Sequence, residues 1–213
     1  MFRNVIFDFD GTIADTNRGI INTFKRSFEE LKLEVPSVAD MSATIGLPLR
    51  QAFAVLHPEL DDAMLDTCFS TYRRFFYEYE LLAINLFPGV KETLAALHNR
   101  GIRMAIATSR GRNSLDIVMK NVGIDAFFEG VFTVESVVNH KPAPDLALLI
   151  IKELGLLPEE TLVVGDTSFD LMMGQGAGCR VCGVTYGNHP YEKLMEVSPD
   201  YVLDSFSGIA DII

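Results

Sequence analysis

The sequence predicts an α/β fold, in which a doubly wound parallel sheet carries a helical domain inserted after its first strand. Two observations predict it. Short β-branched and apolar runs alternate with helical segments along most of the chain, whereas residues 16–85 space their apolar residues at helical intervals and contain no convincing strand. The expected strands are residues 4–9, 103–107, 130–133, 161–164 and 180–184, with a weaker sixth at 201–203.

The strands and the helices between them show the pattern of a buried sheet. Most strand runs are nearly continuous in apolar residues, as expected for parallel strands that are covered on both faces. Proline and glycine mark the ends of two helices. Pro88 suits the first turn of a helix that ends at Gly101, and Pro144 opens another that ends at Gly155.

Residues 16–85 are expected to form a helical cap domain, and residues 1–15 and 86–213 the α/β core domain. An insertion after the carboxyl end of a strand lies over the crevice where open α/β sheets bind ligands, so the cap is expected to act as a lid. Its hinges are expected near residues 15–16 and 86–88. We interpret its two apolar faces as packing between helices rather than as a binding groove. They comprise Ile20, Phe24, Phe28 and Leu31, and Leu65, Phe69, Tyr72, Phe76 and Tyr79.

The charge of the chain limits its partners. The 213 residues include 18 Lys+Arg and 29 Asp+Glu, which gives a net charge of −11. Nucleic acid and anionic membranes are therefore not expected as partners, because they require a basic face. An anionic substrate is compatible with this charge if a metal ion and a few cations gather in one cleft.

The compartment expected from the sequence is the cytoplasm. The chain shows no signal-peptide pattern and no apolar stretch of the roughly 18 residues that suggest a membrane span. Its three cysteines form no disulfide framework, which favours a reducing environment. Cys179 and Cys182 form a C-x-x-C pattern, but it runs into an expected strand, where residues three apart face opposite sides. We interpret this pair as structural rather than as a redox or metal site.

Two acidic clusters follow expected strands. Asp8 and Asp10 project to the same side at the end of the first strand, and a divalent cation such as Mg²⁺ would relieve the repulsion between them. The alternative is an acidic turn that caps the next helix. Asp166 and Asp170 follow the strand at 161–164, where the alternative is a carboxylate at a helix N-terminus.

Two further strand ends add a hydroxyl and a cation. Thr108 and Ser109 follow the strand at 103–107, and Lys141 lies in a proline-framed loop. Each has a simpler reading, as a turn hydroxyl or a surface cation. Taken together with the acidic clusters, they describe a metal ion, a hydroxyl donor and a cation arranged around a phosphoryl group.

These motifs resemble the haloacid dehalogenase superfamily, specifically its phosphoglycolate phosphatase-like members. The order matches along the whole chain, from D-x-D-G-T at residues 8–12 to the hydroxyl at Thr108, the lysine at Lys141 and G-D-x-x-x-D at residues 165–170. The helical insertion matches the superfamily's cap, and the core its Rossmann-like sheet. The motifs are highly specific for the superfamily and poorly informative about the substrate.

The resemblance implies a Mg²⁺-dependent phosphatase. Asp8 would be the nucleophile that forms an aspartyl-phosphate, and Asp10 the general acid and then the general base. The carboxylate of Asp8, the backbone carbonyl of Asp10 and Asp166 would bind Mg²⁺. Asp170 would support this metal site or pair with Lys141.

The resemblance also implies how the phosphoryl group is held. Thr108 and Lys141 would bind its oxygens, and the backbone amides of Ser109 and Phe9 would add donors. Ser109 departs from many relatives, which carry Asn or Gly there, so its side-chain role stays open.

Asp10 separates a phosphatase from other reactions of the superfamily. Dehalogenases lack this carboxylate and phosphonatases change it, so a phosphoester is expected. A sugar phosphomutase of the β-phosphoglucomutase type stays an alternative, because it keeps Asp8 and Asp10. A non-catalytic protein that binds a phosphorylated ligand is the second alternative.

Substrate choice is expected to lie in the cap. Residues 44–50 resemble the cap loop that faces the active site, and Arg50 would meet a substrate carboxylate or a second phosphate; the alternative is a solvated helix residue. Arg18 is a weaker candidate of the same kind. The expected partner is a small phosphorylated metabolite, with phosphoglycolate, sugar phosphate, pyrophosphate and nucleotide all open. Monomer and homodimer both fit.

Overall fold

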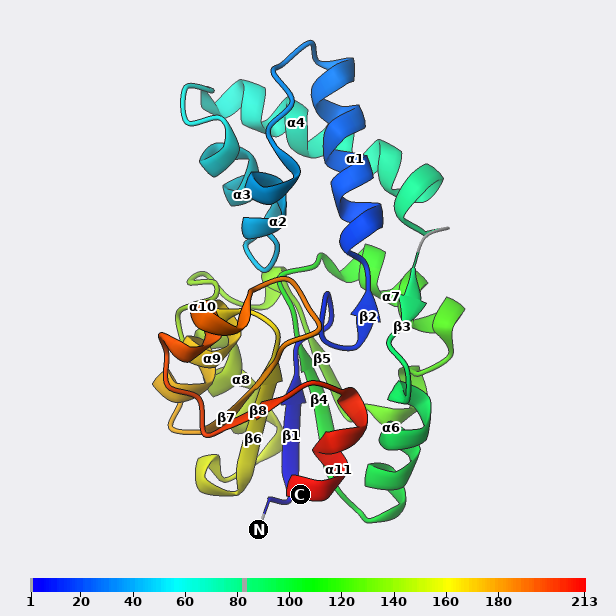
Figure 1. Ribbon diagram of the computed structural model, residues 1–213, viewed down its shortest axis with the longest axis vertical. Coiled ribbons are helices and arrows are strands. Elements are labelled where there is room, and N and C mark those ends of the chain that lie inside the picture. Colours follow the sequence, from blue (N-terminus) through cyan, green and yellow to red (C-terminus); the bar gives the residue numbers. More distant parts are fainter. Residues whose placement is uncertain (1, 82–83) are drawn as a thin grey trace.

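The computed structural model describes residues 2–81 and 84–213, and its core is a six-stranded parallel sheet (Figure 1). The strand order β5-β4-β1-β6-β7-β8 places β1 between β4 and β6. The register pairs Phe7 of β1 with Ile106 and with Val164. The predicted α/β sheet is confirmed. Its strands are β1 Asn4–Phe7, β4 Arg103–Ala107, β5 Gly130–Phe132, β6 Thr161–Gly165, β7 Arg180–Val184 and β8 Tyr201–Leu203.

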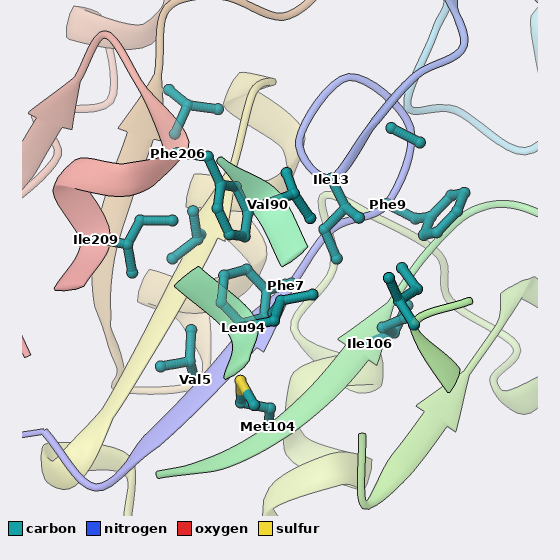
Figure 2. Packing of buried hydrophobic residues seen from close by; sticks show 14 of the residues in the cluster. Val5, Phe7, Phe9, Ile13, Val90, Leu94, Met104, Ile106, Phe206 and Ile209 are labelled. Atoms are coloured by element: carbon teal, nitrogen blue, oxygen red, sulfur yellow. The ribbon is translucent and has the colours of Figure 1, made fainter. Parts of the chain in front are cut away.

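Helices cover both faces of this sheet. Alternate strand residues point to opposite faces, so Phe7 packs with one apolar cluster and Ile6 with the other. Figure 2 shows the first cluster, where Phe7 lies among Leu94, Val90 and Phe206. The helices of the core are α6 Val90–Asn99, α7 Arg112–Val122, α8 Asp145–Leu154, α9 Ser168–Gly176, α10 Tyr191–Met195 and α11 Ile209–Ile212. Short 3₁₀ turns lie at Asp125–Phe127, Val134–Ser136, Pro158–Glu160 and Phe206–Gly208.

The helix ends agree with the sequence only in part. Helix α8 begins after Pro144 and ends at Gly155, as predicted. Helix α6 begins at Val90 rather than at Pro88, because Gly89 adopts a left-handed conformation (φ 78°) that no regular helical turn accommodates.

The cap helices pack around an apolar cluster of their own. The ring centroid of Phe24 lies 5.0 Å from that of Phe53 and 5.1 Å from that of Tyr72. The predicted face of α1 is used for this packing, as are Leu65 and Tyr72 of α4. Phe69 is only half-buried, Phe76 packs instead in the core cluster that contains Phe7, and the Tyr79 ring lies against the Arg26 guanidinium. The elements are α1 Asn17–Glu30, α2 Val38–Ala43, α3 Leu49–Leu56, α4 Asp62–Phe75 and a π-helical turn at Phe76–Glu80.

One small strand pair was not predicted. Strand β2 (Ala14–Asp15) pairs antiparallel with β3 (Asn85–Leu86), so Asn85, expected in a strand-free segment, forms a strand residue. Both chain crossings between the core and the cap helices run through this pair (Figure 1).

The cysteines behave as the sequence predicts. Cys179 packs in the cluster on one face of the sheet and Cys182 in the cluster on the other. Both thiols are free, and burial raises their pKa values to about 11 and about 12 respectively. A high thiol pKa suppresses the reactive thiolate, which agrees with a structural role. Among the described residues, no helix combines the length and the apolar character needed to cross a membrane.

Candidate active site

The carboxyl ends of three adjacent strands bring the predicted polar residues together. Asp8 follows β1, Thr108 follows β4 and Asp166 follows β6, and these strands are neighbours in the sheet. The loop after β5 adds Lys141 from the side. All four side chains are buried, with at most 5% of their residue surface exposed.

Lys141 is the centre of this arrangement. Its Nζ donates hydrogen bonds to Asp8 Oδ1 (2.6 Å), Asp170 Oδ1 (2.6 Å) and the Ala107 carbonyl oxygen (2.8 Å). Burial by itself lowers the pKa of Lys141, but the charges of Asp170 and Asp8 outweigh it and raise the pKa above its ordinary value. Burial also raises the pKa of Asp8, an effect that the charge of Lys141 opposes. The ammonium group therefore stabilises two buried carboxylates at once.

Asp170 has both carboxylate oxygens engaged. Besides Lys141, it accepts hydrogen bonds from the Thr167 backbone amide (3.0 Å) and the Thr167 hydroxyl (2.6 Å). The bond from the Thr167 amide belongs to the capping box at the start of α9, in which the Thr167 side chain accepts in return from the Asp170 backbone amide. Asp170 thus pairs with Lys141 and also caps α9, so the expected pairing with Lys141 and the alternative of a carboxylate at a helix N-terminus both hold.

Asp166 is held by uncharged donors. It accepts hydrogen bonds from the Thr12 hydroxyl (2.9 Å) and from the backbone and side-chain amides of Asn188 (2.7 and 2.8 Å). Burial, followed by the charge of Asp170, raises the pKa of Asp166 to about 7. This carboxylate accordingly lies in a place where a cation would be favourable.

The donor set fits a hard divalent cation. Carboxylate oxygens of Asp8, Asp166 and Asp170 lie within 4.8 Å of one another, and all three residues are buried. Lys141 supplies one positive charge against these three carboxylates, and buried charges need compensation. Oxygen ligands of this kind suit Mg²⁺. The Asp10 carbonyl oxygen, expected as a further ligand, accepts a hydrogen bond from Asn188 Nδ2 (3.3 Å).

Asp10 is paired with Arg110, which sequence reasoning did not single out. The guanidinium donates to Asp10 Oδ1 from Nη2 (2.6 Å) and to Oδ2 from Nε (2.9 Å). Both side chains are largely buried, and the guanidinium carbon lies 5.5 Å from the Phe76 ring centroid. Such bidentate pairs fix geometry as well as charge, so Arg110 sets the orientation of Asp10.

Ser109 joins the core to the cap. Its hydroxyl donates a hydrogen bond to the Gly46 carbonyl oxygen (2.6 Å). Gly46 has a φ of 101°, and a Cβ there would lie 3.1 Å from Thr167 Cγ2 and 3.3 Å from Phe169 Cδ2. The loop requires glycine for both its conformation and its close approach to the core. The neighbouring Thr108 hydroxyl accepts from the Arg110 backbone amide (3.1 Å).

A cavity of about 350 Å³ lies between the core and the cap. Asp8, Asp10, Thr108 and Ser109 line it from the core. From the cap, Arg50 lines it, although its guanidinium is held by Asp62 (2.7 Å) and Asp66 (2.9 Å). Arg18, the weaker cap candidate, is exposed on α1.

Arg110, Asn188 and Thr12 are the site residues that the sequence analysis missed. Arg110 follows the hydroxyl pair Thr108–Ser109 directly, and Asn188 lies in the turn after β7. The rule that polar residues gather at the carboxyl ends of parallel strands would have flagged both. Thr12 belongs to the motif that was recognised, but its hydroxyl was assigned no partner.

The chain is similar to known proteins over its whole length. Residues 5–184 match the family model for haloacid dehalogenase-like hydrolases. The chain is 35% identical to "Probable phosphatase IndB" of Dickeya dadantii, over 96% of this chain and 90% of that protein. It is 34% identical to the pyrophosphatase PpaX of Halalkalibacterium halodurans, over 98% and 95% of the two chains. A solved structure of a predicted phosphoglycolate phosphatase from Haemophilus somnus superposes with a TM-score of 0.89 at 26% identity, over 99% and 97%.

Proposed function

Because the chain belongs to the haloacid dehalogenase-like hydrolase family, we propose that it is a Mg²⁺-dependent phosphatase that acts on a small phosphorylated metabolite through an aspartyl-phosphate on Asp8. The family match and the relatives named as phosphatases indicate that the chain is an enzyme that hydrolyses phosphoric esters. The single observation that supports the finer proposal is the position of Asp8. Asp8 lines the cavity, its carboxylate accepts a hydrogen bond from Lys141, and its carboxylate oxygen lies within 4.8 Å of one from Asp166.

Asp8 is the group that attacks phosphorus. A bond forms between its carboxylate oxygen and phosphorus, while the bond between phosphorus and the ester oxygen breaks. Burial raises the pKa of Asp8, and the charge and hydrogen bond of Lys141 oppose this rise and so favour the ionised, attacking form. Thr108 and the backbone amides of Ser109 and Phe9 then hold the phosphoryl oxygens. Lys141, whose three donors bond to Asp8, Asp170 and the Ala107 carbonyl, would exchange one of these bonds for a phosphoryl oxygen.

Asp10 handles the protons of both half-reactions. It donates a proton to the departing alkoxide and later takes one from the water that cleaves the aspartyl-phosphate. Its carboxylate lines the same cavity as Asp8, and Arg110 holds it in one orientation. Water attack at phosphorus releases inorganic phosphate and restores Asp8.

The carboxylates of Asp8 and Asp166 and the carbonyl of Asp10 would hold the metal ion. Mg²⁺, when bound, supplies positive charge that offsets the charge of the phosphoryl oxygens. Asp170 supports this group indirectly, since its carboxylate fixes Lys141.

The three free, buried cysteines support a reducing compartment such as the cytoplasm.

Release of phosphate from phenyl phosphate tests the proposal. Activity should require Mg²⁺, disappear with EDTA and be lost in Asp8→Asn. Asp116→Asn, an exposed carboxylate on α7 that pairs with Arg112, serves as the matched control and should retain full activity. Phosphate release by Asp8→Asn at the rate of the parent enzyme would remove Asp8 as the nucleophile.

A further inference from the structure

The cap side of the cavity is apolar. From the core, the cavity is lined by carboxylates and hydroxyls around Asp8, but its opposite wall comprises aromatic and aliphatic side chains of the cap. Phe24, Ile45, Leu47, Phe69 and Tyr72 contribute to this wall. Leu47 and Phe69 are half-buried although neither forms part of the buried cap cluster, so they present apolar surface to the cavity.

Two of the arginines that line the cavity are paired with carboxylates. Arg50 pairs with Asp62 and Asp66 of α4, and Arg110 pairs with Asp10. These bonds are 2.6 to 2.9 Å long, which is the range of strong charge-assisted hydrogen bonds. A second anionic group on the substrate would have to displace one of these partners.

Arg73 of α4, a third arginine that lines the cavity, is exposed. Its guanidinium carbon lies 5.7 Å from the Phe69 ring centroid. Its charge is one of several effects that lower the pKa of Glu135, a lining residue of the core. Glu135 itself accepts hydrogen bonds from the Thr133 hydroxyl (2.6 Å) and the Arg112 backbone amide (3.2 Å).

We propose that the cavity takes the leaving group of a phosphate monoester whose alcohol is uncharged and apolar, an alkyl or aryl alcohol, rather than a second phosphate or a carboxylate. The inference rests on the proposed function, because Asp8 must hold the phosphoryl end. An apolar group gains free energy when it replaces water against hydrocarbon walls. An anionic group at the same place loses hydration, and the guanidinium groups of Arg50 and Arg110 already bond to carboxylates. A volume of about 350 Å³ is at the small end of ligand cavities, which suits a compact alcohol.

A series of n-alkyl phosphates, from methyl to butyl, tests the inference with Mg²⁺ present. The leaving alcohols differ little in reactivity, so a change in kcat/KM reports contacts with the cavity. We expect kcat/KM to rise about fourfold for each added methylene until the cavity is filled. Butyl phosphate should exceed both phosphoglycolate and pyrophosphate. A flat series, with either anionic substrate preferred, would overturn the inference.

Substitutions in the cap wall of the cavity show which side chains cause the dependence of kcat/KM on alkyl chain length. Leu47→Ala and Phe69→Ala should lower kcat/KM for butyl phosphate about tenfold and change it less than about twofold for methyl phosphate. Leu56→Ala is the matched control, because Leu56 packs against the cap cluster without lining the cavity. A similar loss in Leu56→Ala, or equal losses with methyl and butyl phosphate, would assign the effect to the packing of the cap and contradict the inference.

The two proposals fail in different ways. If no ester in the series and no phenyl phosphate is hydrolysed with Mg²⁺, the proposed function fails, and the inference fails with it. If phenyl and methyl phosphate are hydrolysed in a manner that depends on Asp8, but chain length has no effect, only the inference about the leaving group fails.

Discussion

Arg110 and Asp10 form a bidentate ion pair in which the guanidinium Nη2 lies 2.6 Å from one carboxylate oxygen and Nε lies 2.9 Å from the other. The pair bridges the ends of β1 and β4, so the side chain proposed as acid and base is fixed by the strand beside its own. The contact holds the Asp10 carboxylate in one orientation.

Arg110→Met should therefore lower kcat about a hundredfold, because misplacement of a reacting group by roughly 1 Å has an effect of this size. KM should change much less. Arg110→Lys should give an intermediate kcat, since a lysine keeps the charge but cannot form two parallel hydrogen bonds. Steady-state kinetics with phenyl phosphate measure both constants. Arg112→Met is the control, and a kcat in Arg110→Met equal to that of the control would refute a positioning role.

The effect of Mg²⁺ on stability should depend on pH through Asp166. Its pKa of about 7 is above the ordinary 3.8, so in the metal-free protein the folded state keeps a proton that the unfolded chain has lost. The free energy of unfolding contributed by Asp166 therefore falls as pH rises from about 4 to about 7. Because Mg²⁺ binds the ionised carboxylate and releases this proton, the metal should raise Tm more at about pH 8 than at about pH 5.5.

Thermal unfolding with and without Mg²⁺ at these two pH values gives the measurement. Asp166→Asn should show a small metal effect at both, since the amide does not titrate. Asp116→Asn should behave as the parent chain does. An equal increase in Tm at both pH values in the parent chain would contradict the linkage to Asp166.

Lys141 should be essential to stability as well as to catalysis. Lys141→Met leaves Asp8 and Asp170 buried beside each other without the ammonium group that bonds to both. Removal of one partner from a buried ion pair destabilises by about 3–5 kcal/mol. Urea unfolding in EDTA at neutral pH measures this loss.

The control for Lys141 is an exposed ion pair. Arg112→Met breaks the bond to Asp116 on the surface of α7, which contributes less than about 1 kcal/mol. Equal urea midpoints for Lys141→Met and Arg112→Met would show that the buried carboxylates do not depend on the ammonium. Addition of Asp170→Asn to Lys141→Met should recover part of the loss.

Ser109→Ala tests whether this side chain acts through the cap. The substitution removes the hydroxyl that donates to the Gly46 carbonyl but retains the Ser109 backbone amide. Loss of one hydrogen bond should lower kcat/KM by about two- to tenfold. Ser207→Ala, which removes an exposed hydroxyl that bonds to Ser205 and does not line the cavity, should leave kcat/KM unchanged. A fall of several hundredfold in Ser109→Ala would instead mean that the hydroxyl contacts the reacting group.

The gathering of Asp8, Thr108, Lys141 and Asp166 could be predicted because each follows a run that reads as a strand. Parallel strands end at one edge, so sequence order alone places their next residues together. The bonds between these residues could not be predicted. Lys141 reaches Asp8 and Asp170 only because of the path of the loop after β5, and that path has no periodic signature.

Other features escape a sequence reading for different reasons. Strands β2 and β3 have two residues each, which is too short for an alternating pattern. The direction of the Arg110 side chain depends on the conformation of a tight turn. Asn188 contacts Asp166 through its backbone and side-chain amides, and an asparagine in a loop is common without such a contact. The sequence therefore gives no signal for this hydrogen bond.

The β2–β3 pair has a consequence for how such enzymes diversify. Asp15 and Asn85 are register partners in this pair, so both covalent connections to the intervening helices lie side by side. A different insert with equally close ends would be accepted there without altering the register of β1, β4 and β6. Exchange of the insert at this junction would replace the cap wall of the cavity while leaving Asp8, Lys141 and Asp166, which lie outside it, in place.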